Sequence, residues 1–334
     1  MEQNENQNPE EHLAFSSRLN LEPLQEAIGK IKDQISKVIV GQEKNIDQLL
    51  VALLSNGHIL LEGVPGVAKT LTAKLLAKTI DADFSRIQFT PDLMPSDIIG
   101  TSIFDLSKSE FEFKKGPIFS QFVLIDEINR APAKTQAALF EVMEERQITA
   151  DGETYKLDRP FIVIATQNPI EQEGTYRLPE AQLDRFLFKI NIGYPNLEQE
   201  IEILLREDQL KEGNKLVEVQ KVISSKEVND FQKLVKEIKI EKNLIDYIAK
   251  VVLNTRDNGF LYLGASPRAS IAILNAAKGF AALKGRDFVT PEDIKLAAIP
   301  VLEHRVVVRP EREMEGLTSK EIIKQIIDSV EIPR

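Results

Sequence analysis

The stretch His58–Thr70 reads HILLEGVPGVAKT and decides the fold of this chain. An apolar strand runs into a loop that contains two glycines and ends in Lys69-Thr70, and a helical pattern follows. A polyphosphate is bound by backbone N–H groups that converge on the anion, and side chains would obstruct that approach. Gly63 and Gly66 are therefore expected to keep the loop open, while the N-terminus of the next helix adds partial positive charge.

Two residues at the end of this loop are expected to carry its chemistry. Lys69 would reach the β- and γ-phosphates of a nucleotide, and the Thr70 hydroxyl would ligate Mg²⁺. The strict pattern has glycine just before the lysine, whereas this chain has Ala68. A methyl group is tolerable there only if the residue is already helical. The alternative interpretation is a strand–turn–helix connection without a ligand.

A second polar pair, Asp126-Glu127, follows the apolar run Phe122 to Ile125. Two carboxylates at the end of a buried strand make little structural sense, because an uncompensated buried charge costs several kcal/mol. Beside a phosphate-binding loop they make chemical sense. Asp126 would hold Mg²⁺ through water, and Glu127 would orient and polarise the attacking water. An acidic strand end that faces solvent is the alternative.

A third apolar run, Phe161 to Ala165, ends in Thr166-Gln167-Asn168-Pro169. Asn168 would lie between the phosphate and the carboxylate pair, where it could hydrogen-bond the γ-phosphate or the water. Taken alone, an asparagine that starts a turn before proline explains the same residues.

Short apolar runs alternate with helical segments from Leu21 to about Pro195, which predicts an α/β fold with a parallel sheet covered by helices. The runs lie at residues 59–61, 122–125, 161–165 and 186–192. Residues 1–20 are polar and are expected to form a flexible tail. The predicted organisation is this tail, an α/β nucleotide-binding domain over residues 21–195, and a smaller all-helical lid domain over residues 196–334.

The helical part is predicted from its capping signals. Ser224 with Glu227 and Thr318 with Glu321 match capping boxes, and Thr290-Pro291 matches an N-cap followed by proline at the first helical position. Further helices are expected near residues 241–256 and 266–284.

Composition narrows the class of protein. The chain of 334 residues has a net charge of −10, no cysteine, and three histidines without metal-ligand spacing. An acidic balance disfavours a dedicated nucleic-acid binder, and no apolar run approaches the roughly 18 to 20 residues that span a bilayer. The N-terminus does not match a signal peptide, so we expect a cytoplasmic protein. GTP is disfavoured because the segment that begins at Asn214 reads NKLV and lacks the guanine-reading aspartate.

The order of motifs GVPGVAKT, FVLIDEINRAP, IVIATQNP, LPEAQLDRF and GASPRAS resembles the MoxR branch of the AAA+ ATPases, from about Val38 to Glu303. The departure from glycine at Ala68 also resembles the loops of that family. Arg177 stands where a proline is expected, and the resemblance offers no account of it.

The resemblance implies further roles. Arg185 matches an arginine finger that reaches the γ-phosphate of a neighbouring subunit, which implies a homo-oligomer, most simply a hexameric ring. Arg268 matches a sensor-2 arginine that couples nucleotide state to the lid, and Arg130 is a further candidate for an intersubunit contact. Surface ion pairs are the alternative for Arg185 and Arg268. The nucleotide-binding residues so expected are Val40, Gly41, Gly63, Val64, Pro65, Gly66, Val67, Ala68, Lys69, Thr70 and Leu71.

The leading hypothesis for function is an ATP- and Mg²⁺-dependent AAA+ motor whose lid moves against the α/β domain and remodels a client protein. The resemblance implies chaperone-like maturation, with partners that bear von Willebrand factor A domains. The alternatives are a nucleic-acid motor, whose hairpin near residues 150–159 would enter a pore, and a nucleotide-gated scaffold with little turnover. A small-molecule kinase fits the order of the motifs least well.

Overall fold

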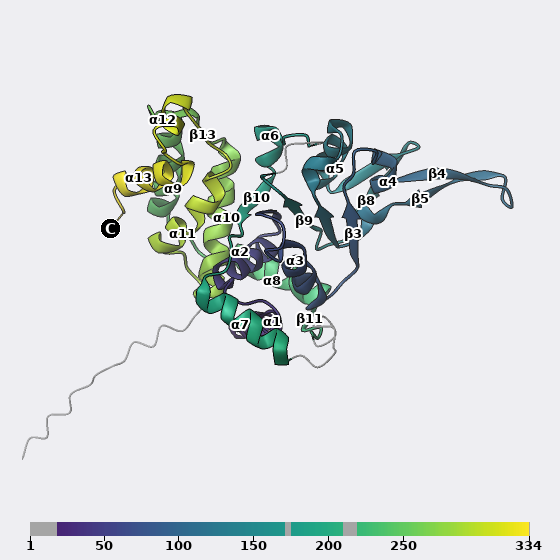
Figure 1. The fold of residues 1–334 in the computed structure, drawn as a ribbon, viewed down its shortest axis with the longest axis horizontal. Coiled ribbons are helices and arrows are strands. Elements are labelled where there is room, and N and C mark those ends of the chain that lie inside the picture. The colour runs from purple at the N-terminus through teal and green to yellow at the C-terminus, as the bar shows by residue number, and fades with distance from the viewer. Residues whose placement is uncertain (1–18, 171–174, 210–218, 334) are drawn as a thin grey trace, which may run out of the picture.

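The computed structural model describes residues 19–170, 175–209 and 219–333. Most of the predicted N-terminal tail lies outside these residues. Within them, a parallel sheet and its helices form one part of the molecule, and a group of helices packs against it (Figure 1).

The sheet has five parallel strands in the order β10-β1-β9-β6-β3. Its strands are β1 (His58–Glu62), β3 (Phe84–Gln88), β6 (Phe122–Asp126), β9 (Ile162–Gln167) and β10 (Phe186–Asn191). The four strands expected from apolar runs are confirmed. The edge strand β3 was missed, because its sequence FSRIQ contains no continuous apolar run and only Ile87 among its residues is buried.

Both faces of the sheet are buried. Alternate residues of β6 enter two different hydrophobic clusters: Phe122 and Leu124 join one, while Val123 and Ile125 join the other. Side chains of successive strand residues point to opposite faces, so each cluster lies on its own face of the sheet. The helix after β1 covers the first face with Leu75 and Leu76, and the helix after β6 covers the second. This double burial confirms the α/β architecture.

The helices of the α/β part are α1 (Glu22–Ser36), α2 (Glu43–Leu54), α3 (Lys69–Lys78), α4 (Pro95–Ile99), α5 (Ala133–Glu145) and α6 (Glu180–Leu183). Two hairpins interrupt it: β4 (Gly100–Asp105) with β5 (Glu110–Lys115), and β7 (Gln147–Ala150) with β8 (Glu153–Lys156). The β4–β5 hairpin projects away from the body of the molecule (Figure 1). No helix within the described ranges is long and apolar enough to cross a membrane.

The C-terminal part is mostly helical and contains α7 (Leu197–Gln209), α8 (Ser225–Glu237), α9 (Lys242–Arg256), α10 (Pro267–Leu283), α11 (Pro291–Leu302), α12 (Pro310–Met314) and α13 (Ser319–Ser329). Its short strand β11 (Ile223–Ser224) pairs with β2 (Ile80–Asp81) of the α/β part, and its strands β12 (Leu261–Leu263) and β13 (Val307–Val308) pair with each other. Both predicted capping boxes form, since Glu227 N–H donates to Ser224 Oγ and Glu321 N–H donates to Thr318 Oγ1.

The helical part is joined to the sheet by a continuous hydrophobic core. The cluster that contains Leu61 and Phe188 of the sheet also contains Ile273 of α10 and Ile323 of α13. Helix α10 packs closely on α2 at Gly279, where a Cβ atom would lie 2.8 Å from Val51 Cγ1. Any movement of these helices against the sheet would therefore have to repack apolar side chains.

His58, the first residue of β1, is fully satisfied as a neutral imidazole. Its Nδ1 accepts from Val163 N–H at 3.0 Å, and its Nε2 lies 3.1 Å from the carbonyl of Met143, to which it donates. Burial lowers its pKa from 6.5 to about 3, and repulsion from nearby Arg146 adds to the effect. His58 is therefore a packed structural histidine.

This histidine predicts acid sensitivity. Between its folded pKa of about 3 and its unfolded pKa of 6.5 the unfolded chain binds the extra proton, so stability falls as the pH falls. From about pH 7 to about pH 5 the free energy of unfolding should drop by about 2 kcal/mol more in the wild type than in His58→Gln. Denaturant unfolding at each pH measures this difference, and equal drops in the two proteins would contradict it.

Candidate functional site

The loop between β1 and α3 holds two residues in left-handed backbone. Gly66 has φ +88°, and a Cβ atom at this position would meet nothing within 4 Å. Ala68 has φ +64° and ψ +22°, so it is not part of the right-handed helix, and the condition for tolerating a methyl group there is not met. Helix α3 begins only at Lys69, and Ala68 precedes it in a conformation that favours glycine. Strained non-glycine backbone of this kind persists only where the surrounding structure fixes it, and it is often found at functional sites.

Gly63 is needed for a different reason from the one expected. A Cβ atom there would lie 2.4 Å from the carbonyl oxygen of Ile192, directly after β10, so close packing of the loop on that chain segment requires glycine. The Gly63 carbonyl also accepts a hydrogen bond from Lys69 Nζ, as does the Val64 carbonyl at 2.7 Å. In this structure the lysine therefore bonds the backbone of its own loop.

A hydroxyl and a carboxylate stand side by side where a metal is expected. Thr70 Oγ1 donates to Asp126 Oδ1 at 2.8 Å, and Thr166 Oγ1 donates to the same oxygen at 3.2 Å. The other oxygen, Oδ2, accepts from Arg86 Nε at 2.6 Å. Oxygen ligands of this kind suit Mg²⁺, which keeps several of its waters and takes one or two protein ligands. The donor set of Thr70 and Asp126 therefore fits the ion.

Glu127 follows the strand end in left-handed backbone, with φ +58°. Its N–H donates to Thr166 Oγ1 at 3.0 Å, which fixes the turn after β6. Its Oε2 accepts from Gln88 Nε2 at 2.8 Å and pairs with Arg130 Nε at 3.1 Å. One carboxylate oxygen is thus engaged twice, by Gln88 and by Arg130.

These groups line one cavity of 390 Å³. Its wall includes Lys69, Thr70, Asp126, Glu127 and Asn168, which the sequence analysis took from three separate segments. The carboxyl ends of β1, β6 and β9 bring those segments together at one edge of the sheet. Asn168 Oδ1 accepts from Ile170 N–H at 3.2 Å, so the turn interpretation of this asparagine also holds.

A second cavity of 530 Å³ continues from the first, and Pro65, Gly66, Ala68 and Leu71 line both. Val40, Gly41 and Val67 line it as well. Gly41 has φ +73°, and a Cβ atom there would collide with the side chain of Gln199 on α7. Gly63 and Val64 line neither cavity. The two cavities together offer a polar end and a more apolar end, as a nucleotide requires.

Arg185 and Arg268 lie in a third cavity, of 290 Å³, which is separate from the first two. Both pair with Glu144 of α5: Arg268 NH2 lies 2.7 Å from one carboxylate oxygen, and Arg185 Nε lies 3.5 Å from the other. Arg185 immediately precedes β10, whose first residue is in register with His58 at the start of β1. The phosphate loop follows the far end of β1, about 17 Å away along the strand at 3.3 Å per residue.

Several residues of the site escaped the sequence analysis. Arg86 and Gln88 contact the two carboxylates from β3, whose residue Gln88 is in register with Asp126. Their spacing of two residues on a strand was the available signal. Glu144 gave no signal, because only the packing of α5 shows which charges it meets. Arg177 is 88% exposed and lies 3.7 Å from Glu180, and nothing in the structure explains its departure from proline.

Fold and site together define a P-loop ATPase of the AAA+ class, and comparison with known proteins agrees. A family model described as "ATPase family associated with various cellular activities (AAA)" matches residues 58–188, and one described as "AAA lid domain" matches residues 253–326. YeaC of Bacillus subtilis is 46% identical, with 93% of this chain and 97% of that protein covered.

Two further relatives specify the branch. "Chaperone MoxR1" of Mycobacterium tuberculosis is 44% identical, with 90% of this chain and 81% of that protein covered. A crystal structure from Cytophaga hutchinsonii, whose ATPase assignment is provisional, superposes with a TM-score of 0.85 at 46% identity and covers 93% of this chain and 96% of that one. The chain belongs to the MoxR family of AAA+ ATPases.

The strained alanine of the loop gives a stability prediction. Ala68→Gly removes a left-handed alanine, which costs about 1–2 kcal/mol, but it loosens the unfolded chain by about 0.4–1 kcal/mol. We expect a net gain of about 0.5–1 kcal/mol in the free energy of unfolding. The matched control is Ala137→Gly on the exposed face of α5, which should lose about 1 kcal/mol. Denaturant unfolding of both variants tests this, and a loss of similar size in each would contradict it.

Proposed function

We propose that this protein hydrolyses Mg²⁺-ATP in a homo-oligomeric ring, most simply a hexamer, and uses the cycle to remodel a client protein. The observation that carries the proposal is the division of the polar groups between the two edges of the sheet. Lys69, Asp126 and Glu127 line one cavity, whereas Arg185 lies at the opposite edge. An arginine finger about 17 Å along the strand from its own phosphate loop has to serve another copy.

The roles of the residues follow from the chemistry of phosphoryl transfer. Thr70 and Asp126 would hold Mg²⁺, directly or through water, and the ion would neutralise charge on the phosphates. Glu127 would orient and polarise the attacking water, and the Asn168 amide nitrogen would donate to the γ-phosphate or the water. Lys69 would turn from the loop carbonyls to the β- and γ-phosphates. The nucleotide base would occupy the larger cavity beside Val40 and Gly41.

Arg185 and Arg268 would act together on the neighbouring nucleotide. Both pair with Glu144, so one carboxylate keeps two guanidinium groups close despite their repulsion. Two positive charges at one place suit the γ-phosphate, whose charge spreads over three oxygens in the transition state. In this proposal Arg268 serves the adjacent copy, because it lies with Arg185 and away from the chain's own cavity.

Phosphate release across a protein dilution series tests the enzymatic part. Activity per chain should rise with protein concentration, because the site is completed by a second copy. Glu127→Gln should lose about 10²–10⁴-fold in turnover, and Arg185→Ala about 10³–10⁵-fold, while both still bind ATP. Specific activity that is unchanged by dilution would contradict the shared site, and wild-type turnover equal to that of Glu127→Gln would indicate a nucleotide-gated scaffold instead.

The β4–β5 hairpin supports a polypeptide client. Leu106 at its turn is 85% exposed and Phe111 is 74% exposed, on an element that stands clear of the body (Figure 1). Its charges are mixed, with acidic Asp105 and Glu112 beside Lys108. Clustered exposed apolar side chains are typical of protein-binding surfaces. A surface that binds nucleic acid would instead be basic, to neutralise the phosphates.

The client surface can be tested with a permanently unfolded polypeptide as the probe. The double variant Leu106→Ser/Phe111→Ser should bind it at least about tenfold more weakly, since each lost apolar contact is worth about 1.5–3 kcal/mol. Basal ATPase activity should not change. Lys108→Ser, at the same turn, is the control and should bind almost normally. Equal affinities for all three proteins, measured by fluorescence anisotropy, would contradict the assignment.

A further inference from the structure

Arg305, three residues after the end of α11 in the helical part, is buried against the segment that carries Arg185. Its side chain is 3% exposed. Its guanidinium donates to the carbonyls of Asp184 at 3.0 Å, Phe186 at 2.6 Å and Leu187 at 3.2 Å. Asp184 and Phe186 are the two neighbours of Arg185 in the chain. One side chain of the helical part therefore hydrogen-bonds the backbone on both sides of the proposed arginine finger.

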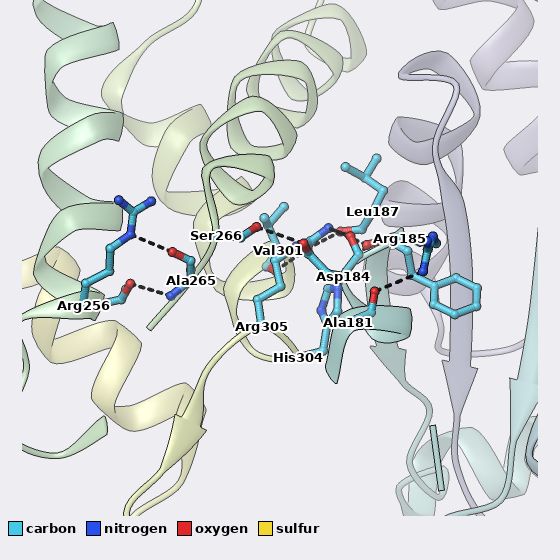
Figure 2. A network of polar contacts seen from close by, with 12 residues as sticks. Ala181, Asp184, Arg185, Leu187, Arg256, Ala265, Ser266, Val301, His304 and Arg305 are labelled. Atoms are coloured by element: carbon cyan, nitrogen blue, oxygen red, sulfur yellow. Dashed lines mark hydrogen bonds and ion pairs between the residues drawn. The ribbon is translucent and has the colours of Figure 1, made fainter. Parts of the chain in front are cut away.

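The carboxylate of Asp184 completes this connection (Figure 2). Its Oδ1 accepts from Arg305 Nε at 2.7 Å, and its Oδ2 accepts from Ser266 Oγ at 2.9 Å. Ser266 is the N-cap residue of α10 and stands two residues before Arg268. A single carboxylate therefore joins the residue next to Arg185 to the helix start that carries Arg268.

The loop before α10 is also fixed by hydrogen bonds to the end of α9. Arg256 Nε donates to the Ala265 carbonyl at 2.8 Å, and Ala265 N–H donates to Thr255 Oγ1 at 2.9 Å (Figure 2). Ser266 thus reaches Asp184 from a fixed backbone. Hydrogen bonds between buried polar groups permit little deviation, because each unmade bond leaves a group without water or partner.

The contacts of residue 305 require the guanidinium group of an arginine. The pKa of Arg305 is lowered because of its burial, and the neighbouring Asp184 carboxylate opposes this effect and so offsets part of the cost of removing the charge from water. Only a planar guanidinium offers five donors in fixed directions, and here they are spread over one carboxylate and several carbonyls. Lysine would keep the charge but could not reach all of these acceptors.

We propose that Arg305 is a positioning residue for Arg185: through Asp184 and the flanking carbonyls it fixes the finger and Arg268 as one unit with the helical part. The inference rests on the proposed function of Arg185 in a neighbouring active site. When the helical part shifts in one subunit, the finger shifts with it, and the effect is felt at the nucleotide of the next subunit. Arg305 therefore acts on the neighbour's reaction and leaves ATP binding in its own subunit unchanged.

Mixed rings separate this role from a general loss of structure. A chain with Glu127→Gln has an intact finger and a dead ATP site, and a chain with Arg185→Ala has the reverse. Mixed, they should release phosphate at interfaces where the first chain supplies its finger to the second. Arg305→Met is then placed in one chain or the other, and total phosphate release, the KM for ATP and co-assembly are measured.

Arg305→Met in the finger-supplying chain should reduce phosphate release by about 10²-fold with the KM for ATP unchanged, as expected when a reacting group is misplaced by about 1 Å. The same substitution in the ATP-binding chain should change little. Arg305→Lys should show the same asymmetry with a smaller loss. Arg286→Met breaks another buried ion pair of the helical part, with Asp293, and should show no asymmetry.

Three outcomes would overturn the proposal. Equal losses from both placements, including loss through failed co-assembly, would make Arg305 a structural residue only. An asymmetry of the same size for Arg286→Met would remove the specific role of the Asp184 contact. If the mixture without Arg305 substitutions is inactive although wild-type rings turn over, the shared active site itself fails and this inference fails with it.

Discussion

The direction of five parallel strands is the constraint on which the rest of this structure depends. Their carboxyl ends meet at one edge of the sheet, so residues that lie 57 positions apart in the sequence, such as Lys69 and Asp126, line one cavity. Their amino ends meet at the other edge, where Arg185 precedes β10. One chain thus carries a polar cavity and a pair of arginines at opposite edges of its sheet. Under the proposed function these two sites serve different neighbours, which a closed ring would satisfy, and turnover would be a property of the assembly.

The helical part is bound to this sheet more tightly than a freely hinged lid would be. One hydrophobic cluster runs through both, and the buried pair of Arg305 and Asp184 joins them beside the finger. Breaking such a pair by removing one partner costs about 3–5 kcal/mol, so a motion that separates the two parts at this point is unfavourable. Motions that carry the helical part and the finger together preserve both contacts. The energy of ATP hydrolysis would then pass between subunits, from one lid to the next active site.

The sequence was sufficient for the architecture and for one half of the site. Apolar runs followed by Lys69-Thr70, Asp126-Glu127 and Asn168 predicted the strands and the residues at their ends, because a buried strand and a phosphate loop each impose a strict local pattern. The polar edge strand β3 has no such pattern, and Arg86 and Gln88 were missed with it. The left-handed backbone of Ala68 could not be predicted either, because the loop pattern alone does not fix the conformation of the residue before Lys69. The pairing of Glu144 with Arg185 and Arg268 depends on tertiary packing, as does that of Asp184 with Arg305, and no local pattern encodes either.

The most direct test of the shared active site is an electron cryomicroscopy structure of the Glu127→Gln protein assembled with Mg²⁺-ATP. The measured quantity is the distance from the Arg185 guanidinium to the nearest γ-phosphate oxygen. The account predicts a hydrogen-bond distance of about 2.7–3.2 Å to the nucleotide of the adjacent subunit, with the contact between Arg305 and Asp184 intact. An assembled ring in which Arg185 remains paired with Glu144 and contacts no phosphate, or in which it reaches the nucleotide of its own chain, would contradict the account.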